Sequence, residues 1–312
     1  MKPSNLSVVV PCHNEQETLP TSFNTLFTLL KKWSKKELIG DYQIVVVNNG
    51  SSDNTLEVAI ELKEKYDKVK IIDLRSNYGY QSSITAGLYN SDFEMVISID
   101  ADLQDDPAKM EEMIHYYYQG FEMVLGIRSS RQKDSFFKRI SANAYYKVLK
   151  LLKVKSEPNH GDFRLLSKKL IEELKQYKEK NRFLRALIFE IESNYACVYY
   201  ERNERKFGET KFNLSQLIKL SIDGISSFTA NPIYVIFYLG LITLILSSLI
   251  SLILTANYLL NKIPIQGWTS LILVILFFGS IQLISISIVG VYISKIYMES
   301  KSRPLYHIRK IH

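Results

Sequence analysis

With 312 residues, the chain is long enough for one large domain or for one domain with an appendage, and its two cysteines fit a reducing compartment and exclude a disulfide-based fold. Its net charge of +7 would suit a nucleic-acid partner, but the basic residues cluster near segments expected to face a membrane, so we favour a membrane and no nucleic acid. No secretory signal is expected, because the apolar run in MKPSNLSVVVP is too short.

The first half of the chain alternates predicted strands with predicted helices. Apolar runs predict strands at 6–11, 42–49, 69–74, 94–100 and 122–128. Helices are expected at about 15–34, 54–65 and 80–90 and after Pro107. Continuous apolar strands alternating with helices predict an α/β fold whose parallel sheet is covered on both faces. Ligands of such sheets bind beyond the carboxyl ends of the strands, which here carry PCHNE, NNGSSDNT and DADLQDDP.

The segment SIDADLQDDP places four carboxylates after the fourth predicted strand. Crowded like charges cost free energy unless a cation lies among them. Asp100 and Asp102 are one residue apart at a strand end, so we expect them to point the same way and to hold Mg²⁺ or Mn²⁺. For Asp105 and Asp106, capping of the following helix is an alternative.

Two segments have amphipathic patterns. Residues 128–155 interleave many Lys and Arg with apolar residues, as in a helix on an anionic membrane surface; a solvated face packed on the sheet is the alternative. Residues 213–230 resemble an interfacial helix ahead of the membrane, and core packing is the alternative.

Residues 233–260 and 268–293 carry no charge, and about 20 apolar residues suffice to cross a bilayer. With the linker NKIPIQG between them they predict a two-helix transmembrane hairpin, and a buried helical pair is the alternative. The tail is richer in Lys and Arg than the linker, so the domain ahead of the hairpin and both termini should lie in the cytoplasm. We therefore expect a first domain at 1–212, a juxtamembrane helix at 213–230, the transmembrane helices at 231–296 and a basic tail at 297–312.

Six motifs occur in a characteristic order: VVVPCHNEQETL, VVVNNGSSDNT, RSNYGYQSSITAGL, ISIDADLQDDP, GIRSSRQKDSFFKR and HGDFRLLSKK. Together they resemble the polyisoprenyl-phosphate glycosyltransferases of glycosyltransferase family 2. RKFGETKF, the two apolar segments and ESKSRPLY are similar to its bacterial two-span branch. The resemblance implies a GT-A fold, Rossmann-like with a mostly parallel sheet. It also implies a nucleotide-sugar donor, a divalent metal and inverting transfer of one sugar to the phosphate of a membrane lipid.

The resemblance also implies roles for individual residues. Those expected to bind the nucleotide-sugar are Pro11, Asn14, Glu15, Asn49, Ser51 and Gln81. Asn48 and Asn49 stand where the family usually has two aspartates, which leaves the base open. Asp100 and Asp102 should bind metal and diphosphate, and Gln104 should lie toward the sugar.

On the acceptor side, Asp162 matches the family's acidic residue beside the donor sugar. It could act as a base, but we favour orientation, because a phosphate acceptor with a second pKa of about 6 is already largely dianionic at neutral pH. The residues expected to bind the acceptor phosphate are Arg128, Arg131, Arg164, Arg202, Arg205 and Lys211. A solvated surface is the alternative for these basic residues.

The expected reaction moves glucose or N-acetylglucosamine from a UDP-sugar to undecaprenyl phosphate at the cell membrane, for cell-envelope glycosylation. A GDP-mannose-dependent mannosyltransferase and a non-catalytic binding subunit are alternatives. A processive polysaccharide synthase is a further one, although the Q-x-x-R-W motif of such synthases is absent: the only tryptophans are Trp33 and Trp268. An oligomer, with a tetramer possible, is expected from the resemblance.

Overall fold

The computed structural model describes residues 3–129, 157, 159–180, 182, 184–201, 231–261 and 267–312. The chain divides into two compact units. The first comprises Met1–Leu217 together with Arg303–His312, and the second comprises Ile218–Ser302. The C-terminal residues therefore return to the unit that contains the N-terminal part of the chain.

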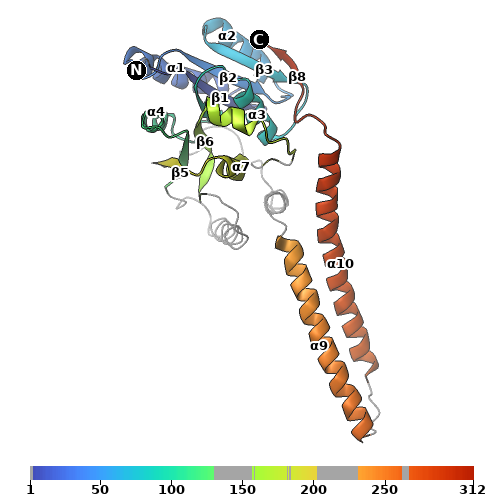
Figure 1. The fold of residues 1–312 in the computed structure, drawn as a ribbon. Coiled ribbons are helices and arrows are strands. Elements are labelled where there is room, and N and C mark those ends of the chain that lie inside the picture. Colours follow the sequence, from blue (N-terminus) through green and yellow to red (C-terminus); the bar gives the residue numbers. More distant parts are fainter. Residues whose placement is uncertain are drawn as a thin grey trace. The chain divides into compact units, whose positions relative to one another are not determined.

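The first unit is built on an eight-stranded sheet (Figure 1). Its strands are β1 (Leu6–Cys12), β2 (Tyr42–Asn48), β3 (Val69–Leu74), β4 (Met95–Ser98), β5 (Met123–Arg128), β6 (His160–Ser167), β7 (Tyr195–Tyr200) and β8 (Ile308–Ile311). Their order across the sheet is β7-β5-β6-β4-β1-β2-β3-β8. β1 pairs in parallel with β2 and β4, and β2 pairs in parallel with β3. The five predicted strands are present, and the predicted, mostly parallel α/β sheet is confirmed.

Three strands were not predicted, and each changes the sheet. β6 lies between β4 and β5 and runs antiparallel to both. β7 pairs in parallel with β5 at one edge, and β8 pairs antiparallel with β3 at the other. The fifth predicted strand is therefore not a neighbour of the fourth.

Helices cover both faces of the sheet. The helices are α1 (Leu19–Lys35), α2 (Thr55–Lys65), α3 (Tyr80–Tyr89), α4 (Met110–Tyr118), α6 (Lys168–Leu174) and α7 (Leu184–Ile191). One core contains side chains of α1, α2 and α4 with Val8 and Val10 of β1, whereas α3 packs against β1 and β2 near Val9. Because alternate strand residues face opposite ways, α3 lies on the other face. In α1, Pro20 stands in the first turn, where its missing N–H costs least, and Phe23, Leu26 and Leu30 are fully buried.

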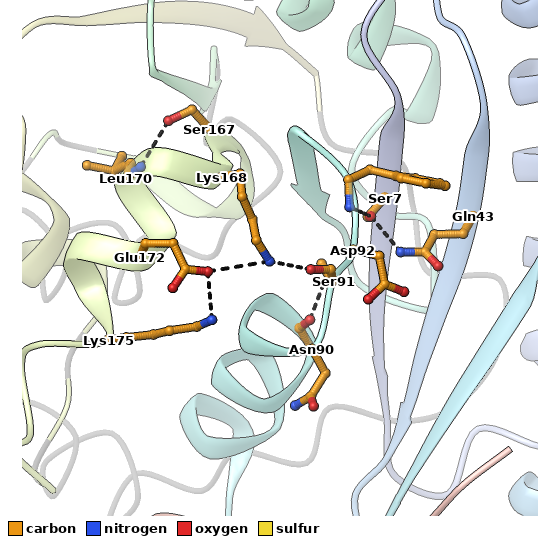
Figure 2. Close-up of polar contacts among 12 residues, drawn as sticks. Ser7, Gln43, Asn90, Ser91, Asp92, Ser167, Lys168, Leu170, Glu172 and Lys175 are labelled. Carbon is orange, nitrogen blue, oxygen red and sulfur yellow. Dashed lines mark hydrogen bonds and ion pairs between the residues drawn. The ribbon is translucent and has the colours of Figure 1, made fainter.

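Several polar contacts lie at the end of the sheet where β1 and β2 begin (Figure 2). Ser7 and Gln43 share a hydrogen bond of 2.8 Å, and the Lys168 ammonium donates to the carbonyl of Ser91. The hydroxyl of Ser167 caps α6 by accepting from the backbone N–H of Leu170 at 3.0 Å. These contacts stabilise the end of the sheet opposite to the predicted site.

The second unit contains α9 (Asn231–Asn261) and α10 (Trp268–Ser300). The apolar side chains described in these helices are mostly exposed; Leu252 and Leu283, for example, are 69% and 68% exposed. Among the described residues, one segment, Phe277–Ser300, is long and apolar enough to cross a membrane. Amphipathic helices are predicted for 128–155 and 213–230. Residues 130–155 of the first segment and the whole of the second lie outside the described part of the chain.

Candidate active site

The carboxyl ends of β1 and β2 are joined by hydrogen bonds between their following loops. Asn14, with φ of 56°, donates from its backbone N–H to the Ser51 hydroxyl at 3.1 Å and accepts from the Ser52 backbone N–H at 2.8 Å. Asparagine tolerates this left-handed conformation better than most residues. The backbone N–H of Glu15 donates to the Thr55 hydroxyl at 2.8 Å. The predicted nucleotide residues Asn14, Glu15 and Ser51 therefore lie together beyond the carboxyl ends of β1 and β2. Pro11 is buried within β1.

The two asparagines at the end of β2 bind different neighbours. The Asn48 amide donates to the Asp73 carboxylate at 2.8 Å. A carboxylate at position 48 would face that buried aspartate and repel it, which gives a physical reason for the amide. Asn49 is 4% exposed; its amide donates to the Asn77 side-chain oxygen at 3.1 Å and accepts from the Tyr78 backbone N–H at 3.0 Å. The Asn49 side chain thus ties the ends of β2 and β3 together.

Asp100 and Asp102 lie in the turn that follows β4. β4 ends at Ser98, so the predicted strand to residue 100 is too long, and strand alternation is not what orients these carboxylates. Desolvation and the negative charges of Asp105, Asp162 and Asp102 raise the pKa of Asp100 to about 7. The Tyr80 hydroxyl donates to the Asp100 carboxylate. The crowded carboxylates make a bound cation favourable at this turn.

The donor set fits a small divalent cation. Magnesium characteristically uses one or two carboxylates and completes its shell with waters and substrate phosphates. No group of three or more His, Cys, Asp or Glu side chains placed to hold a metal occurs among the described residues. Asp100 and Asp102 supply two carboxylates in one turn, which is the number that magnesium commonly takes from a protein.

Asp162 lies near the carboxyl end of β4 because β6 pairs antiparallel with β4. Ser98 of β4 pairs with Arg164 of β6, so Asp162 lies just beyond the end of β4. The carboxylate is buried and paired with the buried guanidinium of Arg164. Arg185 of α7 donates to its other oxygen at 2.7 Å and 3.1 Å. Although burial alone raises it, the charges of Arg185 and Arg164 hold the pKa of Asp162 well below its usual value.

The remaining predicted residues of this region have distinct surroundings. Arg128, at the end of β5, forms an ion pair of 3.4 Å with the buried carboxylate of Asp105. Asp106, rather than Asp105, caps the following 3-10 turn by accepting from the Ala108 backbone N–H at 3.0 Å. The Gln104 backbone N–H donates to Asp102 at 3.2 Å.

Gln81 of α3 accepts from the backbone N–H of Leu184 at 3.2 Å, at the start of α7. This contact holds the helix that carries Arg185. The other predicted acceptor residues, Arg131, Arg202, Arg205 and Lys211, lie outside the described residues.

Sequence reasoning missed two polar residues of the site. Tyr80 stands beside Gln81 in the motif NYGYQ, but its partner Asp100 is 20 residues away in the chain. Arg185 lies in NRFLR, a short basic segment without a chemical signature, and is 23 residues from Asp162. Only the position of Tyr80 within a named motif could have pointed to it.

Comparison with known proteins gives the family. The description "Glycosyl transferase family 2" matches residues 7–175. The uncharacterized glycosyltransferase YkcC of Bacillus subtilis is 36% identical over 97% of this chain and 93% of its own length. A prophage-derived bactoprenol glucosyl transferase of Shigella flexneri is 36% identical over 98% of both chains.

Among solved structures, glucosyl-3-phosphoglycerate synthase from Mycobacterium tuberculosis is 16% identical over 72% of this chain and 79% of its own, with a TM-score of 0.46. The family match covers the strands and loops that form the candidate site, from β1 to α6. The chain is a glycosyltransferase of family 2 with a GT-A-like α/β fold.

Proposed function

We propose that this glycosyltransferase moves one sugar, with inversion, from a nucleotide-sugar to the phosphate of a polyprenyl lipid. The observation that carries the proposal is that two acidic sites at the carboxyl end of β4 differ in how their charge is balanced. Asp100 and Asp102 are crowded and favour a cation, whereas Asp162 is already neutralised by Arg164 and Arg185. The names of the relatives support the acceptor class, since several are bactoprenol glucosyl transferases that align over nearly their whole length.

The donor would lie over the loops after β1 and β2. Asn14, Asn49 and Ser51 would line the nucleotide pocket, with Glu15, Gln81 and Gln104 nearby. Asp100 and Asp102 would hold Mg²⁺ or Mn²⁺, whose charge stabilises a leaving nucleoside diphosphate when the ion is bound. UDP-glucose is the first donor to test, because the most informative relatives are named glucosyl transferases.

Asp162 would orient the reactants and would not act as a proton acceptor. Its carboxylate is buried between two guanidinium groups, which stabilise the charged form. A phosphate monoester has a second pKa of about 6, so at neutral pH it needs little help from a base. Positioning and charge neutralisation would therefore supply most of the rate enhancement.

The structure suggests different roles for the two nearest arginines. Arg164 is 1% exposed, so we assign it to holding Asp162 in place. Arg185 is 37% exposed and can face a substrate while it binds Asp162. Arg128 stays a predicted phosphate ligand, together with Arg131, Arg202, Arg205 and Lys211.

The same proposal places the enzyme in the cell membrane. Two transmembrane helices, formed by α9 and α10, would leave the catalytic unit and both termini in the cytoplasm. The apolar composition of Phe277–Ser300 and the Lys and Arg of the tail support this arrangement. Assembly into an oligomer through these helices remains part of the proposal.

A donor screen tests the reaction. The purified full-length protein, in detergent with undecaprenyl phosphate and MgCl₂ or MnCl₂, is given radiolabelled UDP-glucose, UDP-N-acetylglucosamine or GDP-mannose, and the extracted lipid is counted. We expect label from UDP-glucose. Label from GDP-mannose alone would favour the mannosyltransferase alternative, and no labelled lipid with any donor would overturn the proposal.

A pair of variants tests the cation site. Asp102→Ala should abolish metal-dependent turnover, because it removes one of the two carboxylates expected to bind the ion. Asp106→Ala is the matched control, since Asp106 lies in the same segment but only caps the following turn. Normal activity of Asp102→Ala would remove the metal assignment.

A further inference from the structure

The C-terminal strand β8 carries a bulge beside β3. In this antiparallel pair, Asp73 faces Lys310 and Leu74 faces Ile308. Arg309 is therefore the extra residue, with no partner in the register. A bulge changes the direction in which a side chain points. Here the Arg309 guanidinium lies 3.4 Å from the Asp73 carboxylate and donates to the backbone carbonyl of Arg75 at 3.0 Å.

Asp73 connects Arg309 to the predicted nucleotide loop. Its carboxylate is 2% exposed, and its second oxygen accepts from the Asn48 amide at 2.8 Å. The side-chain oxygen of Asn48 in turn accepts from the Ser51 backbone N–H at 3.3 Å. A continuous series of polar contacts thus runs from Arg309 to the backbone of the loop that follows β2.

His307, the residue before β8, also holds the segment on which this loop rests. The Arg75 backbone N–H donates to the His307 carbonyl at 2.9 Å, and the rings of Tyr78 and His307 are 6.0 Å apart. Gly50, with φ of +60°, approaches this segment so closely that a Cβ there would lie 2.4 Å from the Ser76 carbonyl carbon. Any shift of residues 75–78 would therefore displace the loop.

We propose that Arg309 is a positioning residue for donor binding: through Asp73 and Asn48 it fixes the loop Asn48–Ser51 in the shape that accepts the nucleotide. The inference rests on the proposed function, which makes this loop the nucleotide site. Removing the guanidinium leaves a buried carboxylate without its cation and frees the Arg75 carbonyl. Asp73 and Asn48 would then adopt other arrangements, and the predicted nucleotide pocket would be less preorganised.

The test measures nucleotide binding by the full-length protein in detergent. Calorimetry with UDP, and in parallel with GDP, is carried out in MgCl₂ for the wild type, Arg309→Met, Arg309→Lys and the control Lys310→Met. Lys310 lies on the same strand and is exposed, but makes none of these contacts. We expect Arg309→Met to weaken nucleotide binding roughly three- to tenfold, as suits a partly exposed ion pair to a buried group. Lys310→Met should bind like the wild type, and Arg309→Lys should recover part of the loss.

Kinetics distinguish positioning from a purely structural role. In Arg309→Met the donor KM should rise by the same factor while kcat changes less than about twofold, because the reacting groups are untouched. If Arg309→Met lowers the melting temperature but leaves nucleotide affinity and KM unchanged, the inference is overturned. If the wild type itself binds neither UDP nor GDP, the proposed function fails first, and the inference with it.

Discussion

Asp162 lies between the buried guanidinium of Arg164 and the partly exposed guanidinium of Arg185, and its negative charge pairs with both. Replacing it by asparagine leaves the buried Arg164 without its anionic partner. We expect Asp162→Asn to lower kcat by about 100-fold or more, since preorganised charge at a reaction centre is commonly worth that much. We also expect a lower melting temperature. Initial rates at saturating substrates and thermal unfolding check both effects, and a rate within threefold of the wild type would contradict the assignment.

The acid–base behaviour of Asp162 gives a second check on the same variant. Because Arg185 and Arg164 depress its pKa in the folded protein, its contribution to the free energy of unfolding is present above the unfolded value of about 3.9 and is lost as the pH falls below it. The carboxylate is ionised throughout the range from about pH 6 to about pH 8, so it should produce no limb in the rate profile there. The profile of Asp162→Asn should be lower than that of the wild type. Any limb that comes from Asp100 should move to lower pH, because the Asp162 charge is one cause of the raised pKa of Asp100. A wild-type limb in this range that disappears in Asp162→Asn, instead of moving, would identify Asp162 as a base.

Tyr80 contacts a residue of the proposed cation site without being an expected ligand of the ion. Its hydroxyl donates to Asp100, and groups that orient a ligand in this way commonly change metal affinity by about 10- to 100-fold when they are removed. Tyr80→Phe should raise the Mg²⁺ or Mn²⁺ concentration needed for half-maximal activity and leave kcat at saturating metal nearly unchanged. A metal titration of activity measures this, and an unchanged half-saturation would show that the hydroxyl has no such role.

The residues that the sequence predicted best are those fixed by short motifs. Asp100, Asp102 and Asn14 could be placed at strand ends because the strands before them are plainly apolar. The contacts that define their chemistry could not be predicted, because they join segments far apart in the chain. Asp162 could be named from its motif, but its two cationic partners depend on the path of β6 and on the position of α7.

At the scale of elements, β6 and β8 show where periodicity fails as a guide. β6 reads HGDFRLLS, and three charged or titratable residues among its first five hide a strand that is buried throughout. β8 is only four residues long and contains two basic residues, which is typical of a solvated tail. Both are held by pairing with distant strands, and this pairing leaves no local pattern.

The packing of α3 on β1 gives a prediction at this scale. A Cβ on Gly87 would lie 2.2 Å from a methyl of Val9 and 3.0 Å from a methyl of Val47, so the glycine allows the helix to approach the sheet. Gly87→Ala should cost about 1–3 kcal/mol of unfolding free energy, despite the better helix propensity of alanine. Urea unfolding followed by circular dichroism measures it. The double variant Gly87→Ala/Val9→Ala should be less destabilised than the sum of the two single changes, and strict additivity would contradict the contact.

For the whole molecule, the proposed membrane arrangement predicts which residues a reagent outside the cell can label. In intact cells, a membrane-impermeant maleimide should label a cysteine introduced at Gln266, in the linker between the two helices. It should not label one introduced at Lys310, because the tail is expected in the cytoplasm. Both variants are made in a background without Cys12 and Cys197. Labelling of the second position and not the first would reverse the orientation.

The strand order also restricts how the chain can pass through a bilayer. β8 is hydrogen-bonded into the sheet that contains β1, so the chain leaves this sheet before α9 and rejoins it after α10. A polypeptide that starts and finishes on one side of a barrier must traverse it an even number of times. If α10 traverses the lipid, a second traverse must precede it, and α9 is the only long helix described between the strands and α10. A one-helix anchor would place the final strand across the membrane from the sheet that it completes.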